Sequence, residues 1–244
     1  MERTNLLAAL VRDGEAFARA CDEAGADAPV ASCPGWTVDD LLWHLTEVQH
    51  FWRWVLAERA VTPDAYVEPE RPSGDALTTV YRSGLEALVT SLRDTPPDAA
   101  IWTWTSDHSA GWLVRRIAHE TAVHRWDAEV AAGSPLAIDA TLASDGIDEF
   151  LTWFLSPADH AEPVGGSVHI HCSDVAGEWT LRPTGDGFGN GFDMTREHAK
   201  GDCALRGSAS DLLLTLWRRQ PPSSIDVVGD ADVAARFIAW PALS

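Results

Sequence analysis

Residues 117–127 read IAHETAVHRWD and place two potential metal ligands, Glu120 and His124, four positions apart. In an α-helix this spacing separates two side chains by only about 40° around the axis, so both lie on one face. The face belongs to a helix predicted over residues 111–132, and it is apolar. Burying a carboxylate or an imidazole without a partner costs several kcal/mol, which predicts that a partner exists. His119 lies about 140° from His124 and cannot share that partner.

A second stretch, residues 33–45, reads CPGWTVDDLLWHL and predicts another helix over residues 37–59. Thr37 followed by Asp40 forms a modest capping box, with Asp where Glu is usual. His44 falls on the apolar stripe of this helix, which should face the interior of a bundle. His44 is therefore the best candidate for a third ligand beside Glu120 and His124.

Asp127 follows His124 by three residues and has two possible roles. It is either a fourth oxygen ligand or an outer hydrogen-bond acceptor for the ligand histidine. We favour the outer role, because two histidines and one carboxylate leave an open coordination position, as catalytic metal sites do. The alternative to a metal remains open: a single histidine on an apolar face is usually a core histidine bonded to a neighbour. A Glu–His pair at this spacing is also common on ordinary helices.

The composition excludes several classes of function. The chain has 244 residues, of which 37 are acidic and 18 basic, giving a formal net charge of -19 that disfavours nucleic-acid binding. No apolar run has the length of a membrane span, so no membrane association is expected. The four cysteines form no CxxC pair, which fits reduced thiols and a cytoplasmic location.

The periodicity changes along the chain and predicts an α+β protein of two domains. Four helices with long connections indicate an N-terminal four-helix bundle over residues 1–160, a range that also takes in a fifth helix at 142–155. A smaller α+β domain is predicted over 161–244, beginning with alternation at 168–172. There, His169 and His171 share one face of a strand, a pattern that favours a solvent-facing row over a metal pair.

The two helical motifs, CPGWTVDDLLWHL and RIAHETAVHRWDAE at residues 116–129, closely resemble the mycothiol-dependent maleylpyruvate isomerase family of actinobacteria. The stretch LRGSASDLLL at residues 205–214 is similar to the small second domain of that family. The resemblance implies a DinB-like metal-binding bundle in which His44, Glu120 and His124 hold the ion, with zinc expected. It also implies mycothiol as a thiol cosubstrate.

The resemblance further implies that an arginine of the second domain is linked to activity. The matching segment is LWRR, and it leaves Arg218 and Arg219 as equal candidates. An arginine would hold a carboxylate of a small electrophilic substrate by a two-pronged hydrogen bond. The expected enzyme is a mycothiol-dependent isomerase or S-transferase. Two alternatives stay open: a metal-dependent hydrolase that uses a metal-bound water, and a non-catalytic metal-bearing protein that binds small ligands or senses thiol stress.

Overall fold

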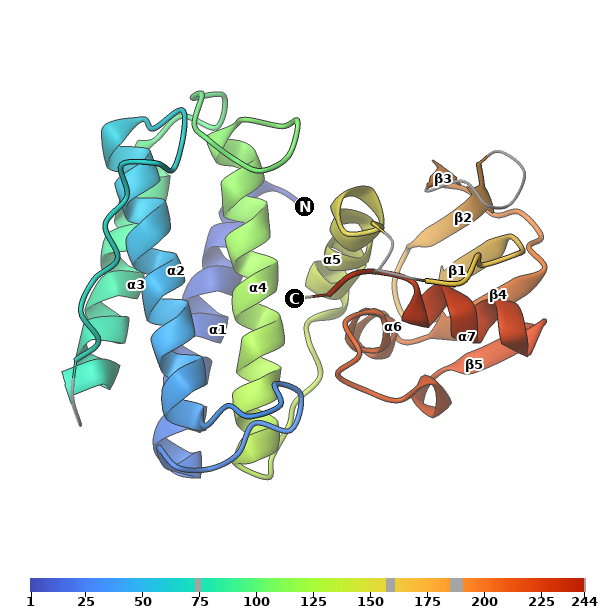
Figure 1. The fold of residues 1–244 in the computed structure, drawn as a ribbon, viewed down its shortest axis with the longest axis horizontal. Coiled ribbons are helices and arrows are strands. Elements are labelled where there is room, and N and C mark those ends of the chain that lie inside the picture. The colour runs from blue at the N-terminus through green and yellow to red at the C-terminus, as the bar shows by residue number, and fades with distance from the viewer. Residues whose placement is uncertain (73–75, 157–160, 185–190, 244) are drawn as a thin grey trace. The chain divides into compact units, whose positions relative to one another are not determined.

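The computed structural model describes residues 1–72, 76–156, 161–184 and 191–243. The chain divides into two compact units, Met1–Leu136 and Ala137–Ser244, each described below by itself (Figure 1). Among the described residues, no helix combines the length and the apolar character that crossing a membrane requires.

The first unit is a four-helix bundle, as the sequence predicts. Figure 1 shows its helices running side by side. Helix α1 packs mainly on α4, and α2 packs mainly on α3. The helices are α1 (Arg3–Ala24), α2 (Val38–Glu58), α3 (Ala76–Asp94) and α4 (Ala110–Ala131).

The start of α2 is fixed by the predicted capping box. Thr37 Oγ1 accepts a hydrogen bond from the Asp40 backbone N–H at 3.3 Å, and Asp40 Oδ2 accepts one from the Thr37 N–H at 2.9 Å. These bonds satisfy backbone donors that lack partners within the helix. Because the helix begins at a defined residue, the face on which His44 lies is also defined.

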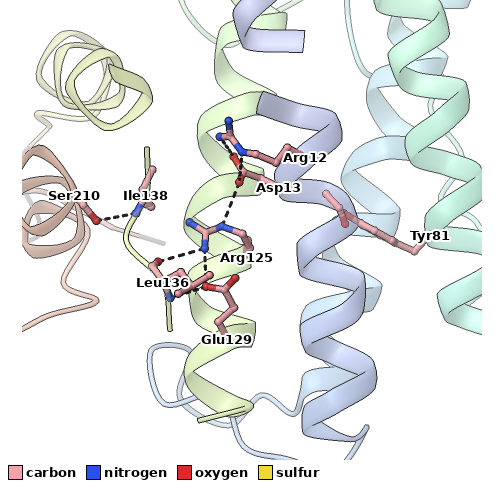
Figure 2. A network of polar contacts seen from close by, with 9 residues as sticks. Arg12, Asp13, Tyr81, Arg125, Glu129, Leu136, Ile138 and Ser210 are labelled. Carbon is pink, nitrogen blue, oxygen red and sulfur yellow. Dashed lines mark hydrogen bonds and ion pairs between the residues drawn. The ribbon is translucent and has the colours of Figure 1, made fainter. Parts of the chain in front are cut away.

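Charged residues are buried between α1 and α4. Figure 2 shows the Arg125 guanidinium between Asp13 of α1, at 3.3 Å, and Glu129 of α4, at 2.6 Å. Glu129 Oε2 also accepts from the Leu136 backbone N–H at 2.9 Å. All three charged side chains are buried, so opposite charges and backbone groups replace the water that each has lost.

The second unit begins with helix α5 (Ala140–Trp153). This helix packs on α6 (Ala209–Leu216). The Trp217 ring centroid lies 5.0 Å from that of Phe150 and 4.9 Å from that of Phe154. The structure thus divides the chain after Leu136, whereas the expected boundary at 160/161 groups this helix with the bundle. The helical pattern of residues 142–155 reveals an apolar face and does not reveal what covers it.

A five-stranded sheet forms the rest of the second unit, in the order β3-β2-β1-β4-β5. The β1–β4 pair is parallel and the other pairs are antiparallel. The predicted small α+β domain is confirmed, although β3 and a short 3-10 turn at Pro222–Ser224 have no counterpart in the prediction. The strands are β1 (Val168–Cys172), β2 (Glu178–Pro183), β3 (Phe192–Thr195), β4 (Cys203–Gly207) and β5 (Asp226–Gly229).

Side chains alternate between the two faces of β1. Val168 and Ile170 are fully buried on the face that meets helix α7 (Ala231–Ala239). His169 and His171 point to the opposite face. His169 is only 7% exposed, so the prediction of a solvent-facing histidine row is wrong for this residue.

Candidate metal centre

Helix α2 contributes His44, about two turns after its first residue. The His44 ring lies against Trp36, with ring centroids 5.3 Å apart. Trp36 is placed by the turn before the helix, in which its backbone N–H donates to the Cys33 carbonyl at 3.0 Å. Gly35 adopts a φ of 87° in this turn, a left-handed conformation that glycine reaches without strain.

Helix α4 contributes Glu120 and His124 from one face. His44 Nε2 lies 3.6 Å from Glu120 Oε1, and the His44 and His124 ring centroids are 5.1 Å apart. One potential ligand atom from each of the three residues lies within 4.8 Å of the others. His119, one residue before Glu120, is buried elsewhere and is not part of this cluster.

The orientation of His124 is set by a chain of hydrogen bonds. Its Nδ1 lies 2.9 Å from Asp127 Oδ2, and Asp127 Oδ1 accepts from Ser32 Oγ at 2.6 Å. Asp127 is 1% exposed, so solvent does not compete for these bonds. A carboxylate only accepts hydrogen bonds, so this contact places the hydrogen on Nδ1 and leaves the Nε2 lone pair of His124 available.

The charge on Glu120 is favoured by its surroundings. Burial raises the pKa of Glu120, but the close contact with His44, the charge of Arg116 and the nearby His124 outweigh it and lower the pKa to about 2. Arg116 Nε lies 3.8 Å from Glu120 Oε2, one helical turn away on α4. Glu120 is therefore an anion at neutral pH, which is the form that binds cations.

The cluster remains open to solvent on one side. The exposed fractions of the side chains are 32% for His44, 19% for Glu120 and 11% for His124. Two imidazoles and a carboxylate are a common ligand set for zinc and related ions, with positions left for a substrate atom. The fit to a divalent metal therefore rests on donor chemistry, proximity and access.

Sequence reasoning missed two contacts that shape this cluster. Arg116 stands four residues before Glu120, and this i,i+4 spacing is a signal that could have identified it. Ser32 bonds to Asp127 across 95 residues of chain, and no local pattern reveals such a pair.

Comparison with known proteins decides the family. Residues 7–129 match the model of the mycothiol maleylpyruvate isomerase N-terminal domain, and residues 141–236 match the C-terminal domain of the same enzymes. The chain belongs to the mycothiol-dependent maleylpyruvate isomerase family. Family membership is what the motifs of α2 and α4 indicated.

Solved structures agree with this family at the level of the fold. A crystal structure of mycothiol-dependent maleylpyruvate isomerase matches with a TM-score of 0.64 and 13% identity, over 93% of each chain. A histidine-to-alanine mutant of that enzyme matches with a TM-score of 0.63, the same identity and the same coverage. None of the curated proteins compared with this chain matches it.

The two candidate arginines of this family member lie in the turn after α6. Arg218 adopts a φ of 57°, in the left-handed region that usually takes glycine. Its guanidinium donates to the carbonyls of Ile238 at 3.1 Å, Ala239 at 2.8 Å and Pro241 at 2.6 Å. The three bonds of the Arg218 guanidinium are therefore all made to backbone carbonyls of residues 238–241. Arg219 donates from Nη1 to the Trp217 carbonyl at 3.0 Å.

Proposed function

We propose that this family member is an enzyme that uses mycothiol as cosubstrate and a divalent metal, zinc, held by His44, Glu120 and His124. The observation that carries the proposal is the convergence of these three side chains within 4.8 Å of one another on two helices of the bundle. Family membership supports mycothiol as the thiol, because the matching domains are those of mycothiol-dependent isomerases.

Each residue around the proposed ion has a separate role. His44 and His124 offer neutral nitrogen lone pairs, and Glu120 offers a negative charge. Asp127, held by Ser32, keeps His124 in one tautomer and one orientation. An ordinary cysteine thiol has a pKa of about 8.5, and a bound divalent ion would lower the pKa of the mycothiol thiol and so supply thiolate at neutral pH.

The reaction class we propose is addition of the mycothiol sulfur to an electrophilic carbon of a small substrate. Rotation about the former double bond followed by release of the thiol gives cis–trans isomerisation, and retention of the sulfur gives S-transfer. For the substrate carboxylate, Arg218 and Arg219 both remain candidates; three backbone carbonyls engage Arg218, and the Trp217 carbonyl engages Arg219. A planar guanidinium matches a carboxylate with two parallel hydrogen bonds.

The test compares two histidines of helix α2. In His44→Ala, metal content should fall by about one ion per chain and mycothiol-dependent turnover of maleylpyruvate should fall to background, because a ligand to the ion of the bundle is lost. The matched control is His50→Ala, which removes a ring bonded to Tyr66 at 2.9 Å and should retain both properties. Metal is measured by mass spectrometry of the purified chain.

The other outcomes are equally definite. Normal metal occupancy in His44→Ala would overturn the ligand assignment. Metal-dependent turnover of ester or amide substrates without added thiol would replace this proposal with hydrolysis by a metal-bound water. Absence of turnover with either class, while small ligands still raise the melting temperature, would indicate a binding protein.

A further inference from the structure

A second group of metal-ligating side chains lies in the α+β unit, on the face of the sheet opposite α7. Strands β1 and β2 pair so that His171 is opposite Glu178 and His169 is opposite Thr180. In an antiparallel pair, directly opposed residues point to the same face. The strand register therefore brings His169, His171 and Glu178 together.

A third histidine reaches this group from the segment between β3 and β4. His198 Nδ1 lies 3.1 Å from Glu178 Oε1, and the His198 ring centroid is 4.8 Å from that of His169. Two contacts hold this segment in place without any ion. Thr180 Oγ1 donates to the Glu197 carbonyl at 3.1 Å, and Arg196 forms an ion pair with Asp148. His198 is thus brought to the sheet by contacts outside the cluster.

Without an ion, the hydrogen bonds within the cluster leave one buried polar atom without a partner. Glu178 Oε1 lies 2.5 Å from His171 Nδ1 and also contacts His198 Nδ1, so it engages two of the imidazoles. His169 is more than nine-tenths buried, and its Nε2 has no hydrogen-bond partner. Leaving a buried polar atom unsatisfied costs about 1–3 kcal/mol. Hydrogen bonding therefore explains three members of the cluster and leaves the most buried one unexplained.

We propose that His169, His171, Glu178 and His198 form a second metal site, which takes a divalent transition ion of the zinc class. One ligand atom from each residue lies within 4.8 Å of the other three. Three imidazoles and one carboxylate suit zinc, nickel or copper, whereas calcium and magnesium prefer oxygen ligands throughout. Four protein ligands fill a tetrahedral shell, as in structural sites, and so distinguish this site from the three-ligand cluster of the bundle.

The electrostatics of the cluster agree with this ligand set. Burial, followed by the charge of His198, lowers the pKa of His169 and favours the neutral ring, which is the form that donates a lone pair. Burial raises the pKa of Glu178, but its hydrogen bonds with His171 and His198 outweigh burial and lower it. His198 is 74% exposed, so an ion has a path to the buried nitrogen of His169.

Metal binding at this site would cross-link segments of the α+β unit and so stabilise its fold. An ion held by all four residues would tie the segment between β3 and β4 to strands β1 and β2. Metal binding to the folded chain alone raises its stability by mass action. The second site therefore acts on the melting of the α+β unit, and the first site acts on thiol-dependent turnover.

The test counts ions in the full-length chain after metal removal and reloading with Zn²⁺, using variants of both clusters. The unaltered chain should hold about two ions, and His198→Ala and Glu178→Gln should each hold about one while keeping the ion of the bundle. His44→Ala should also hold about one, and the double variant His44→Ala/His198→Ala none. The matched control is the exposed His108→Ala, which should keep both ions.

A second readout separates a built site from loose surface binding. Co²⁺ in place of Zn²⁺ should give the intense visible absorption of a four-coordinate ion in His44→Ala and lose it in His44→Ala/His198→Ala. Zn²⁺ should raise the melting temperature of His44→Ala and not that of the double variant. The proposal is overturned if His198→Ala and Glu178→Gln bind as many ions as the unaltered chain. It is also overturned if His44→Ala holds none. Because the two clusters are varied separately, the ion count at the second site can be interpreted even if the proposed function of the first site is wrong.

Discussion

At the residue scale, the orientation of each side chain determines whether His44, Glu120 and His124 could bind one ion together. The decisive contact is that between Asp127 and His124, because it fixes which ring nitrogen of the histidine carries the hydrogen. Ser32 in turn holds the aspartate from the loop that precedes α2. Orientation of a ligand by such outer contacts strengthens metal binding, since less rotational freedom is lost when the ion arrives.

Replacement of Asp127 should therefore weaken metal binding without abolishing it. In Asp127→Asn, the amide no longer guarantees the correct tautomer of His124, and we expect roughly 10- to 100-fold lower zinc affinity. Competition with a chromophoric chelator measures the change. Asp22→Asn, which removes a carboxylate bonded to Arg82 on the bundle surface, serves as the control. Equal affinities in the two variants would contradict an orienting role for Asp127.

At the scale of the element, the start of α2 depends on a carboxylate and therefore on pH. The hydrogen bond from the Thr37 backbone, followed by that from Arg71, lowers the pKa of Asp40 to about 2. The unfolded chain titrates the same group near pH 3.9. Because the folded pKa is the lower one, this contribution to stability is complete above about pH 4 and is lost as the pH falls toward 2.

Replacing the carboxylate should reduce this acid sensitivity. We expect the free energy of unfolding of Asp40→Asn to fall less steeply between about pH 4 and pH 2 than that of the unaltered chain. Urea denaturation at several pH values measures the slopes. Asp98→Asn, at an exposed turn residue, should retain the original slope. An unchanged slope in Asp40→Asn would show that this cap does not contribute to the loss of stability at acidic pH.

The end of α6 has an unusual residue at a position that glycine normally occupies. The Arg218 N–H donates to the Thr215 carbonyl at 3.0 Å, and the Arg219 N–H donates to the Leu214 carbonyl at 2.8 Å. These are the two bonds of a Schellman motif, whose left-handed residue is here Arg218. A left-handed non-glycine residue costs about 1–2 kcal/mol. The bonds of its guanidinium to three carbonyls offset this cost.

Two substitutions separate these opposing effects. Arg218→Ala keeps the strained backbone and loses the three bonds, so we expect it to lower the free energy of unfolding by about 1–2 kcal/mol. Arg218→Gly loses the same bonds and relieves the strain, so the loss should be smaller. Arg219→Ala tests the other candidate and should lower turnover of carboxylate substrates if Arg219 holds the carboxylate. Loss of activity only in the Arg218 variants would assign the carboxylate to Arg218, and loss only in Arg219→Ala would assign it to Arg219.

At the scale of the whole molecule, the first unit contains charges where a core normally contains none. Arg125 lies between Asp13 and Glu129, and its removal would leave the buried Glu129 without this cation and Asp13 with Arg12 alone among the described residues (Figure 2). We expect Arg125→Met to lower the free energy of unfolding by about 3–5 kcal/mol. The triple variant Asp13→Leu/Arg125→Met/Glu129→Leu should recover much of the loss, because the three buried charges are removed together, while Arg12, half exposed, remains accessible to water. Equal destabilisation of both variants in urea denaturation would show that packing, and not charge, explains the loss.

The sequence alone determines a large part of this protein. The four bundle helices follow from apolar residues at helical spacing, and the start of α2 follows from Thr37 and Asp40. The proximity of Glu120 to His124 also follows from local geometry, because four residues of helix bring two side chains to one face. The family follows from the two motifs that contain these residues. All of these features depend on residues only a few positions apart.

Only the tertiary structure decides the rest. His44 lies 3.6 Å from Glu120 across 76 positions because α2 and α4 belong to one bundle. Ser32 meets Asp127, α5 meets α6, and the nitrogen of His169 is buried beside His198 for the same reason: each depends on the packing of segments distant in sequence. Periodicity indicates that a side chain has a buried face, but its partner is selected by loop paths, strand register and packing, which a local pattern does not encode.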